Sequence, residues 1–411
     1  MEEATAMEVE EPKSKKFGLK NSIQTNFGND YVFQIVPKDD WSSMAVSLST
    51  KAVKLYSPAT GQFQGECKGH SDTINQISFS VSSSSSSPHV LHSCSSDGTI
   101  RAWDTRTFQQ VSCISAGSSQ EIFSFSFGGS NDNLLAAGAK SQILFWDWRN
   151  GKQVACLEES HIEDVTQVHF VPDNRNKLLS ASVDGLMCIF NTDGDINDDD
   201  NLESVINVGT SIGKVGFFGE TYKKLWCLTH IESLSIWDWR DARNEANLLE
   251  ARSLASDSWT LDHLILPIMS EIFKDIWLRK LEYGTTALEL LITLLIATTQ
   301  GEGESLWVIG GTNAGALGYF PVNYRGVGTI GSPEAILGGG HTGVVRSVLP
   351  MSSMKGGCAQ SQGIFGWTGG EDGRLCCWLS DDSSEINRSW ISSALVMKPP
   401  KARKKKRHNP Y

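Results

Sequence analysis

The stretch HSCSSDGTIRAWDTR, at His92–Arg106, contains the pattern that decides the fold. Its AWD strand ending recurs in related form seven times, at the aromatic residues Tyr56, Trp103, Trp146, Phe190, Trp237, Tyr319 and Trp378. Successive aromatic positions lie 47, 43, 44, 47, 82 and 59 residues apart. Four of these gaps match the ~40–45 residues that one four-stranded propeller blade needs. The sequence therefore predicts an all-β, seven-bladed β-propeller.

Three of the seven units carry a fuller pattern of polar residues. Each has a His at its start, and an Asp that lies four residues after a hydroxyl residue and six before the aromatic residue. The three sets are His70, Ser93, Asp97 and Trp103; His161, Ser180, Asp184 and Phe190; and His341, Thr368, Asp372 and Trp378. This pattern resembles the WD-repeat family, which implies a hydrogen-bonded relay that pins each blade. We interpret these residues as structural, because a buried relay is stable only when each member is satisfied.

The relay pattern is incomplete in the other four units. The position of the Asp is taken by Thr50, Lys140, Ile231 and Asn313. Those blades are predicted to depend on apolar packing.

Composition predicts a packed globule in a reducing compartment. The 411 residues are 40% hydrophobic and 20% charged, which argues against general disorder. The nine cysteines include no C-x-x-C pair, and no signal peptide precedes them. We therefore expect no metal site, no cofactor and no membrane span.

Charge divides the chain into an acidic body and a basic tail. The formal net charge is −11, yet residues 398–411 contain only basic charges. The dense basic group consists of Lys401, Arg403, Lys404, Lys405, Lys406 and Arg407. This tail is predicted to contact a nuclear import receptor or nucleic acid, and the alternative is a solvated tail without a partner. The acidic body argues against nucleic-acid binding elsewhere.

The expected organisation is a disordered segment at 1–16, a propeller at 17–397 and the basic tail at 398–411. Residues 17–27 are predicted to supply an outer strand to blade seven, which would remove an open sheet edge.

An anomalous segment at 263–303 interrupts blade six. The alternation of strand patterns and turn residues stops in this segment, and the spacing of its apolar residues is typical of a helix. Polar residues interrupt the apolar stretch too often for a membrane span. Three interpretations remain open: an inserted helical hairpin that recruits a partner, a buried supplement to blade six, or translated sequence that is not native coding sequence. Residues 263–269 are the candidate first strand of this blade.

Two sequence motifs of enzymes occur in the chain, but the elements expected around them do not fit the chemistry of those motifs. Residues 326–331 match G-x-G-x-x-G, but Pro333 follows where a dinucleotide-binding site needs a helix. Residues 209–213 match the G-x-S-x-G nucleophile motif, but they join two expected strands. We predict no catalytic residues and no enzyme activity.

The tetrapeptide Trp-Asp-x-Arg occurs three times, with its Arg at Arg106, Arg149 and Arg240. It is similar to the box found in WD-repeat receptors that dock onto the adaptor of cullin-type ubiquitin ligases. An Arg projecting beyond the third strand could bind a partner carboxylate bidentately. The alternative is local pairing only.

Longer runs, such as KSKKFGLKNSIQTNFG, EESHIEDVTQVHF and GWTGGEDGRLCCW, resemble the WD repeat-containing protein 89 family, and its plant member in particular. The resemblance covers residues 7–260 and 305–411. It implies a non-catalytic scaffold for protein-protein interactions, linked to growth and development and located in nucleus and cytoplasm. Partners are expected on the loop face that bears Ser96, Val183, His230, Thr312 and Glu371. The alternatives are a ubiquitin-ligase substrate receptor and a ribosome-assembly factor.

Overall fold

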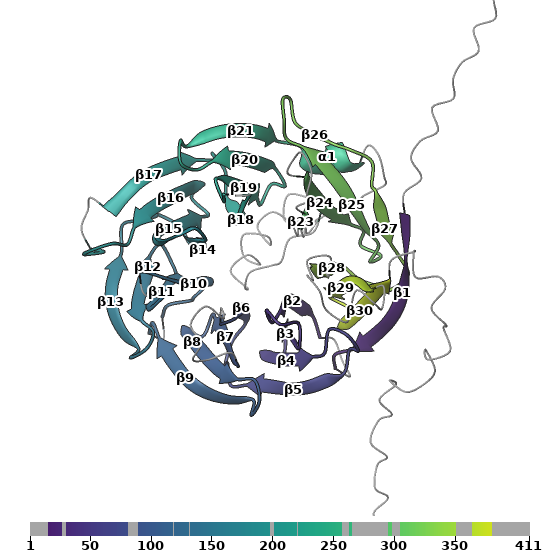
Figure 1. Cartoon of the computed structure of the whole chain (residues 1–411), viewed down its shortest axis with the longest axis horizontal. Coiled ribbons are helices and arrows are strands. Elements are labelled where there is room, and N and C mark those ends of the chain that lie inside the picture. Colours follow the sequence, from purple (N-terminus) through teal and green to yellow (C-terminus); the bar gives the residue numbers. More distant parts are fainter. Residues whose placement is uncertain are drawn as a thin grey trace, which may run out of the picture.

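The computed structural model describes residues 15–26, 30–80, 89–117, 119–130, 132–197, 201–219, 221–256, 263–264, 295–297, 305–350 and 364–379. Nearly all regular structure in these residues is β-strand. The sheets stand around a common centre like the blades of a propeller (Figure 1). The predicted all-β propeller is therefore confirmed.

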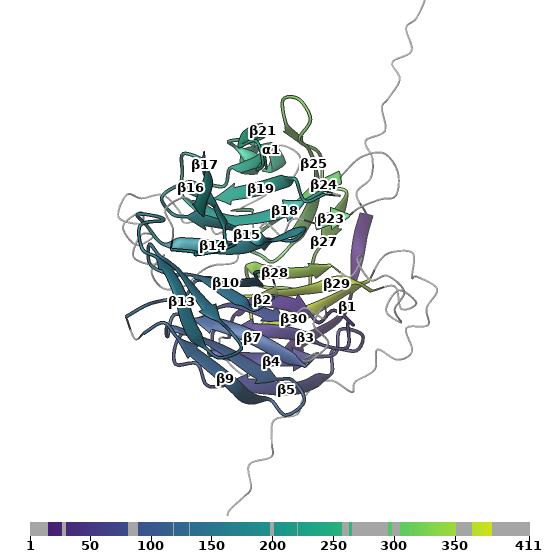
Figure 2. The ribbon, with the colours of Figure 1, turned by 60° about the vertical axis from the view of Figure 1, so that its left-hand side comes forward.

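Five separate sheets have four strands each, in sequence order, and we name them blades one to five. Blade one contains β2 (Val32–Pro37), β3 (Met44–Leu48), β4 (Ala52–Tyr56) and β5 (Phe63–Lys68); blade two, β6 (Ile74–Phe79), β7 (Val90–Ser95), β8 (Thr99–Asp104) and β9 (Gln109–Ser115); blade three, β10 (Ser124–Gly128), β11 (Leu134–Gly138), β12 (Ile143–Asp147) and β13 (Lys152–Leu157); blade four, β14 (Val165–Val171), β15 (Asn174–Ser182), β16 (Leu186–Asn191) and β17 (Leu202–Asn207); blade five, β18 (Ile212–Phe218), β19 (Lys224–Thr229), β20 (Leu234–Asp238) and β21 (Arg243–Leu248). In each blade the first strand lies innermost and the fourth lies at the rim (Figures 1 and 2).

A sixth sheet has ten strands, and we name its two halves blades six and seven. Blade six contains β22 (His263–Leu264), β23 (Leu295–Ala297), β24 (Ser305–Gly311), β25 (Leu317–Asn323), β26 (Thr329–Ile330) and β27 (Ala335–Leu337), and blade seven contains β28 (Val345–Pro350), β29 (Ile364–Gly370), β30 (Arg374–Leu379) and β1 (Lys15–Gln24). The ring has seven blades when this ten-stranded sheet is counted as two blades.

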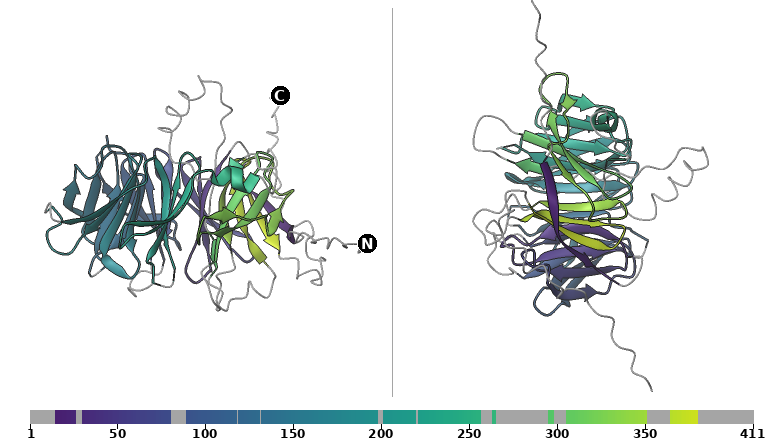
Figure 3. Two further views of the ribbon diagram at one scale, coloured as in Figure 1. Left: turned by 90° about the horizontal axis from the view of Figure 1, so that it is seen from above. Right: turned by 90° about the vertical axis from the view of Figure 1, so that its right-hand side faces the viewer.

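Strand β1 joins the two halves of that sheet. Its residues 18–24 pair antiparallel with β30, which confirms that the N-terminal segment supplies the outer strand of blade seven. Its residues 15–17 pair in parallel with β27 of blade six, which the sequence did not predict. Both views of the rim show β1 between β27 and β30 (Figures 1 and 3). The predicted boundary at residue 17 is thus too late, because Lys15 and Lys16 already belong to the strand.

The first strand of blade six is formed by two short pieces. His263 and Leu264 pair with Gly311 and Gly310 of β24. Residues 295–297 pair antiparallel with residues 305–307 of the same strand. The two pieces follow one another in the same direction, so the chain between them interrupts a single strand position.

This arrangement corrects the prediction for residues 263–303. The helical interpretation is wrong at 295–297, where the apolar residues form strand β23, and the described part of the candidate strand at 263–269, residues 263–264, is strand β22. Residues 265–294 lie outside the described residues. A short helix before the segment, α1 (Ala251–Ser256), was not predicted.

The hydrophobic core is divided among the junctions between neighbouring blades. One cluster joins Val53 and Leu55 of blade one to Ile77, Leu91 and Trp103 of blade two. These side chains are at most 1% exposed. Alternation along each strand sends apolar residues to both faces of a blade, because each blade is covered by a neighbour on both sides.

The innermost strands are also linked by hydrogen bonds that a backbone N–H of one blade donates to a side-chain oxygen of the blade before it. Their free edges carry N–H groups that need acceptors. Four of these bonds run from Ile35 N to Ser347 Oγ (2.9 Å), Ile77 N to Gln34 Oε1 (2.9 Å), Phe125 N to Gln76 Oε1 (2.8 Å) and Phe170 N to Ser126 Oγ (3.0 Å). Blades seven, one, two, three and four are therefore tied in succession.

Candidate functional site

The relay of blade two lies inside the sheet, at the end where its second and third strands meet. His70 Nδ1 is 2.9 Å from Asp97 Oδ2, and its Nε2 is 2.7 Å from Ser93 Oγ. The indole N–H of Trp103 donates to the same Oγ at 2.8 Å. The Asp97 carboxylate also accepts bonds from Ser71 N and Thr99 Oγ1. The structure thus brings all four predicted side chains together.

Blade seven repeats this geometry. His341 Nδ1 lies 3.0 Å from Asp372 Oδ1, and its Nε2 lies 2.7 Å from Thr368 Oγ1. The indole N–H of Trp378 donates to Thr368 Oγ1 at 2.8 Å. The two relays therefore connect the start of a blade to its second and third strands in the same way.

The relay of blade four has one hydrogen bond fewer. His161 contacts Asp184 through Nδ1 at 3.0 Å and Ser180 through Nε2 at 2.7 Å. Phe190 occupies the aromatic position and is buried, but it has no N–H to donate. Packing of the ring replaces the hydrogen bond.

Burial makes these groups unsuited to act on a substrate. The His side chains of the three relays are at most 1% exposed and the Asp side chains at most 7%. Burial alone would raise the pKa of the Asp97 carboxyl, but hydrogen bonds from His70, Thr99 and Ser71 outweigh burial and hold this pKa well below its usual range. In blade four, burial lowers the pKa of His161 although Asp184 opposes the shift. These properties fit groups that stabilise the blades.

The four positions without a relay Asp lie in the corresponding turns. Thr50 and Asn313 are exposed, and Ile231 is 54% exposed. Lys140 Nζ forms an ion pair with Glu121 Oε1 at 3.0 Å. None of these four residues carries a carboxylate, and their blades contribute to the apolar clusters between neighbouring blades.

The predicted recognition residues stand in the turns between second and third strands. Four of them donate a backbone N–H to the residue just before an inner strand: Ser96 to Thr73 (3.0 Å), Val183 to Asp164 (3.0 Å), His230 to Ser211 (2.9 Å) and Glu371 to Val344 (2.8 Å). The fifth residue, Thr312, donates its N–H to Ala316 within its own turn. All five residues are half-buried, so they form part of one face without dominating its surface.

The sequence did not predict the most exposed apolar side chain near these turns. Ile162 follows the relay His161 and is 86% exposed, although its backbone N–H is held by Asp184 at 3.2 Å. Four acidic residues surround it in the sequence, at Glu158, Glu159, Glu163 and Asp164. An isoleucine fixed in an acidic segment could have been recognised as a contact residue.

Ion pairs hold other parts of the same face. Arg252 of α1 contacts Glu232 in the turn of blade five at 3.2 Å, and Arg346 contacts Glu371 in blade seven. Burial raises the pKa of Glu232 to about 7, although Arg252 opposes that shift. The helix therefore serves to anchor this turn.

The three Arg residues of the Trp-Asp-x-Arg boxes lie at the other end of the third strands. Arg106 donates Nε and Nη2 to Asp104 at 3.1 and 2.6 Å, and Arg149 does the same to Asp147 at 3.1 and 3.0 Å. Arg240 donates to Asp173 at 2.9 Å. Their side chains are 65%, 59% and 41% exposed. The structure therefore shows local pairing of guanidinium groups that remain accessible.

The two enzyme-like motifs occupy connections between strands. Residues 209–213 link β17 to β18, and Ser211 Oγ is 2.6 Å from His230 Nδ1 across this turn. Residues 326–331 lie between β25 and β27 and include the two-residue strand β26. Neither motif is followed by the helix that its chemistry requires.

Metal ligands and reactive thiols are the other groups that could support chemistry at such a site. In the part of the chain that the structure describes, no three His, Cys, Asp or Glu side chains gather where they could hold a metal ion. Burial raises the pKa of the Cys67 and Cys188 thiols to about 12, which makes them poor nucleophiles. No helix in the described ranges is long and apolar enough to cross a membrane. The basic group at 401–407 lies outside the described residues.

Comparison with known proteins agrees with this geometry. The family model "WD domain, G-beta repeat" matches residues 61–104 and 151–191. The chain is 68% identical over 398 residues to the WD repeat-containing protein GTS1 of Arabidopsis thaliana, an alignment that covers 97% of this chain and 93% of that protein. It is 37% identical over 195 residues to a WD repeat-containing protein 89 homolog of Dictyostelium discoideum, covering 47% and 51% of the two chains. The chain therefore belongs to the WD-repeat proteins, in the group that resembles WD repeat-containing protein 89.

Proposed function

We propose that this protein is a non-catalytic scaffold that binds other proteins on the face bearing the turns between second and third strands. Membership of the WD-repeat family supports a role in protein interaction. The relay histidines and aspartates near this face are buried and bonded to one another, so they are not available to a substrate. A partner would recognise this face by its shape, its charge and its apolar groups.

The observation that carries this proposal is the exposed Ile162. Hot spots in interfaces are few and become fully desolvated at the centre of the contact, so one strongly exposed apolar side chain is a candidate anchor. The acidic residues beside Ile162 favour a partner that presents basic groups around an apolar pocket. The acidic net charge of the chain would speed the encounter with such a partner.

The test compares two exposed apolar residues of the same blade. Ile162→Lys changes the face, and Val205→Lys changes the outer strand β17, where Val205 is 45% exposed. Tagged full-length protein is purified from cells and its partners are identified by mass spectrometry. We expect Ile162→Lys to lose a set of partners that Val205→Lys retains. Identical partner lists for both variants and the wild type would refute a role of this face.

We also propose that the protein occurs in both nucleus and cytoplasm and that its basic tail directs import. The dense group at 401–407 supports this proposal. Deleting residues 401–411 should move a fluorescent fusion out of the nucleus without changing the melting temperature. Unchanged nuclear accumulation would contradict the import role. The link to growth and development stays a prediction from the family resemblance.

A second candidate function is substrate reception for a cullin-type ubiquitin ligase. The exposure of Arg106, Arg149 and Arg240 favours it, since each guanidinium could exchange its local carboxylate for one of an adaptor. The triple substitution by Ala should then remove ligase adaptors from the purified complexes while other partners stay. Ribosome-assembly factors among the partners of the wild type would instead support the third alternative, a role in ribosome assembly.

A further inference from the structure

The tetrapeptide Trp-Asp-Trp-Arg ends the third strand of two blades, three and five. In both blades the indole N–H of the second tryptophan donates to a backbone oxygen. Trp148 donates to Asp132 at 2.8 Å, and Trp239 donates to Tyr222 at 2.7 Å. Each of the two tryptophans lines a gap between its own blade and the blade before it. The same four residues therefore border two junctions of the ring.

The opposite walls of the two gaps also correspond. In blade two, Ala102 of β8 pairs with Ser112 of β9, and both residues line the first gap. In blade four, Ile189 of β16 pairs with Ser204 of β17, and both residues line the second gap. Ala102 and Ile189 each stand one residue before the recurring aromatic residue. The two gaps are thus equivalent positions in the fold.

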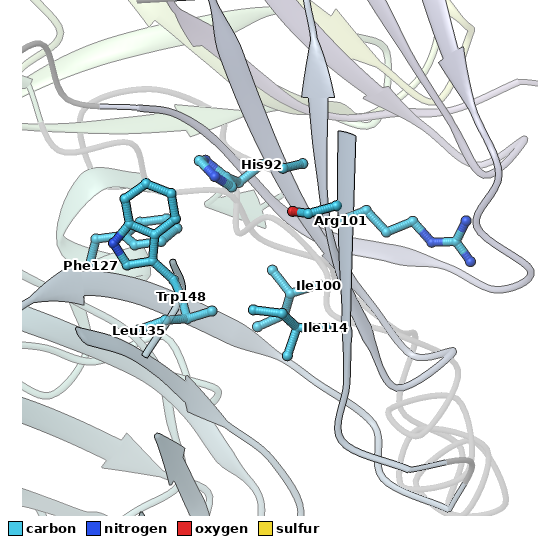
Figure 4. A pocket seen from close by; sticks show the side chains of 9 residues that line it. His92, Ile100, Arg101, Ile114, Phe127, Leu135 and Trp148 are labelled. Carbon is cyan, nitrogen blue, oxygen red and sulfur yellow. The ribbon is translucent and has the colours of Figure 1, made fainter. Parts of the chain in front are cut away.

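The gap between blades two and three is almost filled. Its cavity volume is about 10 Å³, which is room for one water molecule. Figure 4 shows Phe127 and Trp148 on one side of this gap and Ile100 and Ile114 on the other. His92 lines the same gap, and its Nδ1 has no hydrogen-bond partner among the described residues. A single water would satisfy this atom.

The gap between blades four and five is open, and we name it the Arg240 pocket. Its cavity volume is about 340 Å³, which lies in the range of ligand-binding pockets. One wall is lengthened, because β15 has nine residues and the second strands of the other four-stranded blades have five or six. Asn174 begins this long strand, and Lys177 of the same strand forms an ion pair with Glu203 of β17. With Arg240, the lining carries two cations and one carboxylate.

Arg240 is oriented differently from its counterpart Arg149. Arg149 donates both Nε and Nη2 to Asp147 of its own tetrapeptide. Arg240 instead donates Nη2 to Asp173 of blade four at 2.9 Å, and its guanidinium carbon lies 5.4 Å from the centroid of the Trp239 ring. Among the described residues, Nε and Nη1 of Arg240 donate to no acceptor. The guanidinium group therefore keeps donors for a ligand of the pocket.

The other unused donors of the pocket indicate the same class of ligand. In the part of the chain that the structure describes, Asn174 Nδ2 and Ser204 Oγ form no hydrogen bond. A carboxylate offers acceptors only and carries the charge that complements a guanidinium. The net charge of −11 opposes the approach of a strongly acidic ligand. We therefore expect one carboxylate in a segment that is otherwise uncharged.

We propose that the Arg240 pocket is a second binding site for a protein partner and takes one Asp or Glu side chain of an otherwise uncharged peptide segment. The carboxylate accepts hydrogen bonds from Arg240, and Asn174 and Ser204 donate to the same ligand. A neighbouring residue of the peptide fills the rest of the volume. This site lies at the other end of the blades from Ile162, and it uses neither Arg106 nor Arg149. It is therefore independent of the recognition face and of the ligase candidate.

The first test selects short peptides on the full-length protein from a display library whose members are uncharged apart from one central Asp or Glu. Dissociation constants of the selected peptides are measured by fluorescence anisotropy. Arg240→Gln keeps the aliphatic stem and removes the guanidinium, and we expect it to weaken binding by at least about tenfold. Arg149→Gln is the matched control, because it makes the same change at the filled junction, and it should leave binding unchanged. Ile162→Lys should also leave it unchanged. Failure to select any peptide whose binding depends on Arg240 overturns the proposal.

The second test locates the carboxylate and the pocket. Replacing the peptide Asp or Glu by Asn or Gln should weaken binding to the wild type but not to Arg240→Gln, and equal losses in both proteins would refute the contact with Arg240. Ser204→Phe fills the pocket without changing a charge and should abolish binding. Val205→Phe is the control on the other face of β17, where Val205 is 45% exposed, and should bind as the wild type does. Undiminished binding to Ser204→Phe would show that the peptide lies elsewhere.

Discussion

Blades two and six are equivalent units of the ring, but they are stabilised in different ways. Blade two has a continuous first strand and a complete relay from His70 to Trp103. Blade six has a first strand in two pieces, an exposed Asn313 where the relay Asp would stand, and a three-residue outer strand, β27. β27 is covered by β1, which comes from the other end of the chain. A blade that lacks its own polar relay is thus supported by a strand from elsewhere.

The largest effect should come from removing that strand. Deleting residues 1–24 opens the edge of β30 and uncovers β27, and we expect a loss of more than about 5 kcal/mol, enough to unfold a domain of ordinary stability. Deleting residues 1–17 removes the parallel pairing with β27 and the stacking of Phe17 on Phe365, and should cost less, about 3 kcal/mol. Denaturant unfolding of both variants measures the difference. A 1–17 deletion as stable as the wild type would show that β1 does not support blade six.

The aromatic residue at the recurring strand ending is the next difference between blades two and six. Trp103→Ala removes a side chain that is 1% exposed and bonded to Ser93, and should cost ~3–5 kcal/mol. Trp378→Ala should behave alike. In blade six, the hydroxyl of Tyr319 is buried and has no partner among the described residues. Tyr319→Phe should therefore leave the free energy of unfolding unchanged or raise it by about 1 kcal/mol. A large loss for Tyr319→Phe would reveal a missing partner.

The relay Asp can be tested against its counterpart in blade six. Asp97→Ala leaves His70, Thr99 and Ser71 N without their acceptor and should cost about 2–3 kcal/mol. Asn313→Ala changes an exposed side chain and should stay within about 0.5 kcal/mol. Thermal melts of the two variants provide the measurement. Similar melting temperatures would argue that the relay does not stabilise blade two.

Blade two should also respond to pH through His92. The folded pKa of about 4 lies below the ordinary value of about 6.5, so the unfolded chain binds the proton first as pH falls. The stabilising contribution is complete above about pH 6.5 and is lost as pH falls toward 4. Between pH 7 and 5.5 the wild type should lose about 1 kcal/mol more than His92→Phe. Parallel pH profiles for the two proteins would contradict this account.

The smallest effect is expected from the interruption of blade six. Leu264 pairs with Gly310 and Leu295 pairs with Trp307, so Ile309 and Val308 of β24 separate the two pieces. Replacing residues 265–294 by two strand-forming residues should restore a continuous strand, with stability unchanged or slightly higher. Replacing the whole of 262–303 would instead remove β22 and β23 and should destabilise the blade. A marked loss on the shorter replacement would show that 265–294 contribute to the fold.

The origin of residues 265–294 is a separate question. Sequencing of transcripts across residues 260–306 tests whether they are native coding sequence. Spliced messages that encode the whole segment as the main species would contradict the interpretation as an artefact, and a native insertion would then be the preferred docking element.

The sequence by itself determined the repeated blades and the members of the three relays. Strand alternation and turn residues are local, so the recurring aromatic strand ending was enough to identify one strand of each blade, such as β8 and β12. The relay could be recognised because its hydroxyl, Asp and aromatic residues have fixed spacings along a hairpin. These features need no knowledge of distant parts of the chain.

Only the tertiary structure decided how the ring is completed and what remains accessible. The parallel pairing of Lys15 with Ala335 joins residues that are far apart in sequence, and no local pattern encodes such a partner. The pairing of both 263–264 and 295–297 with β24 is long-range in the same sense. The solitary Nδ1 of His92 and the local bonds of Arg106 depend on which side chains meet in space. Sequence patterns specify periodic contacts within a blade, whereas contacts between blades are set by packing of the whole ring.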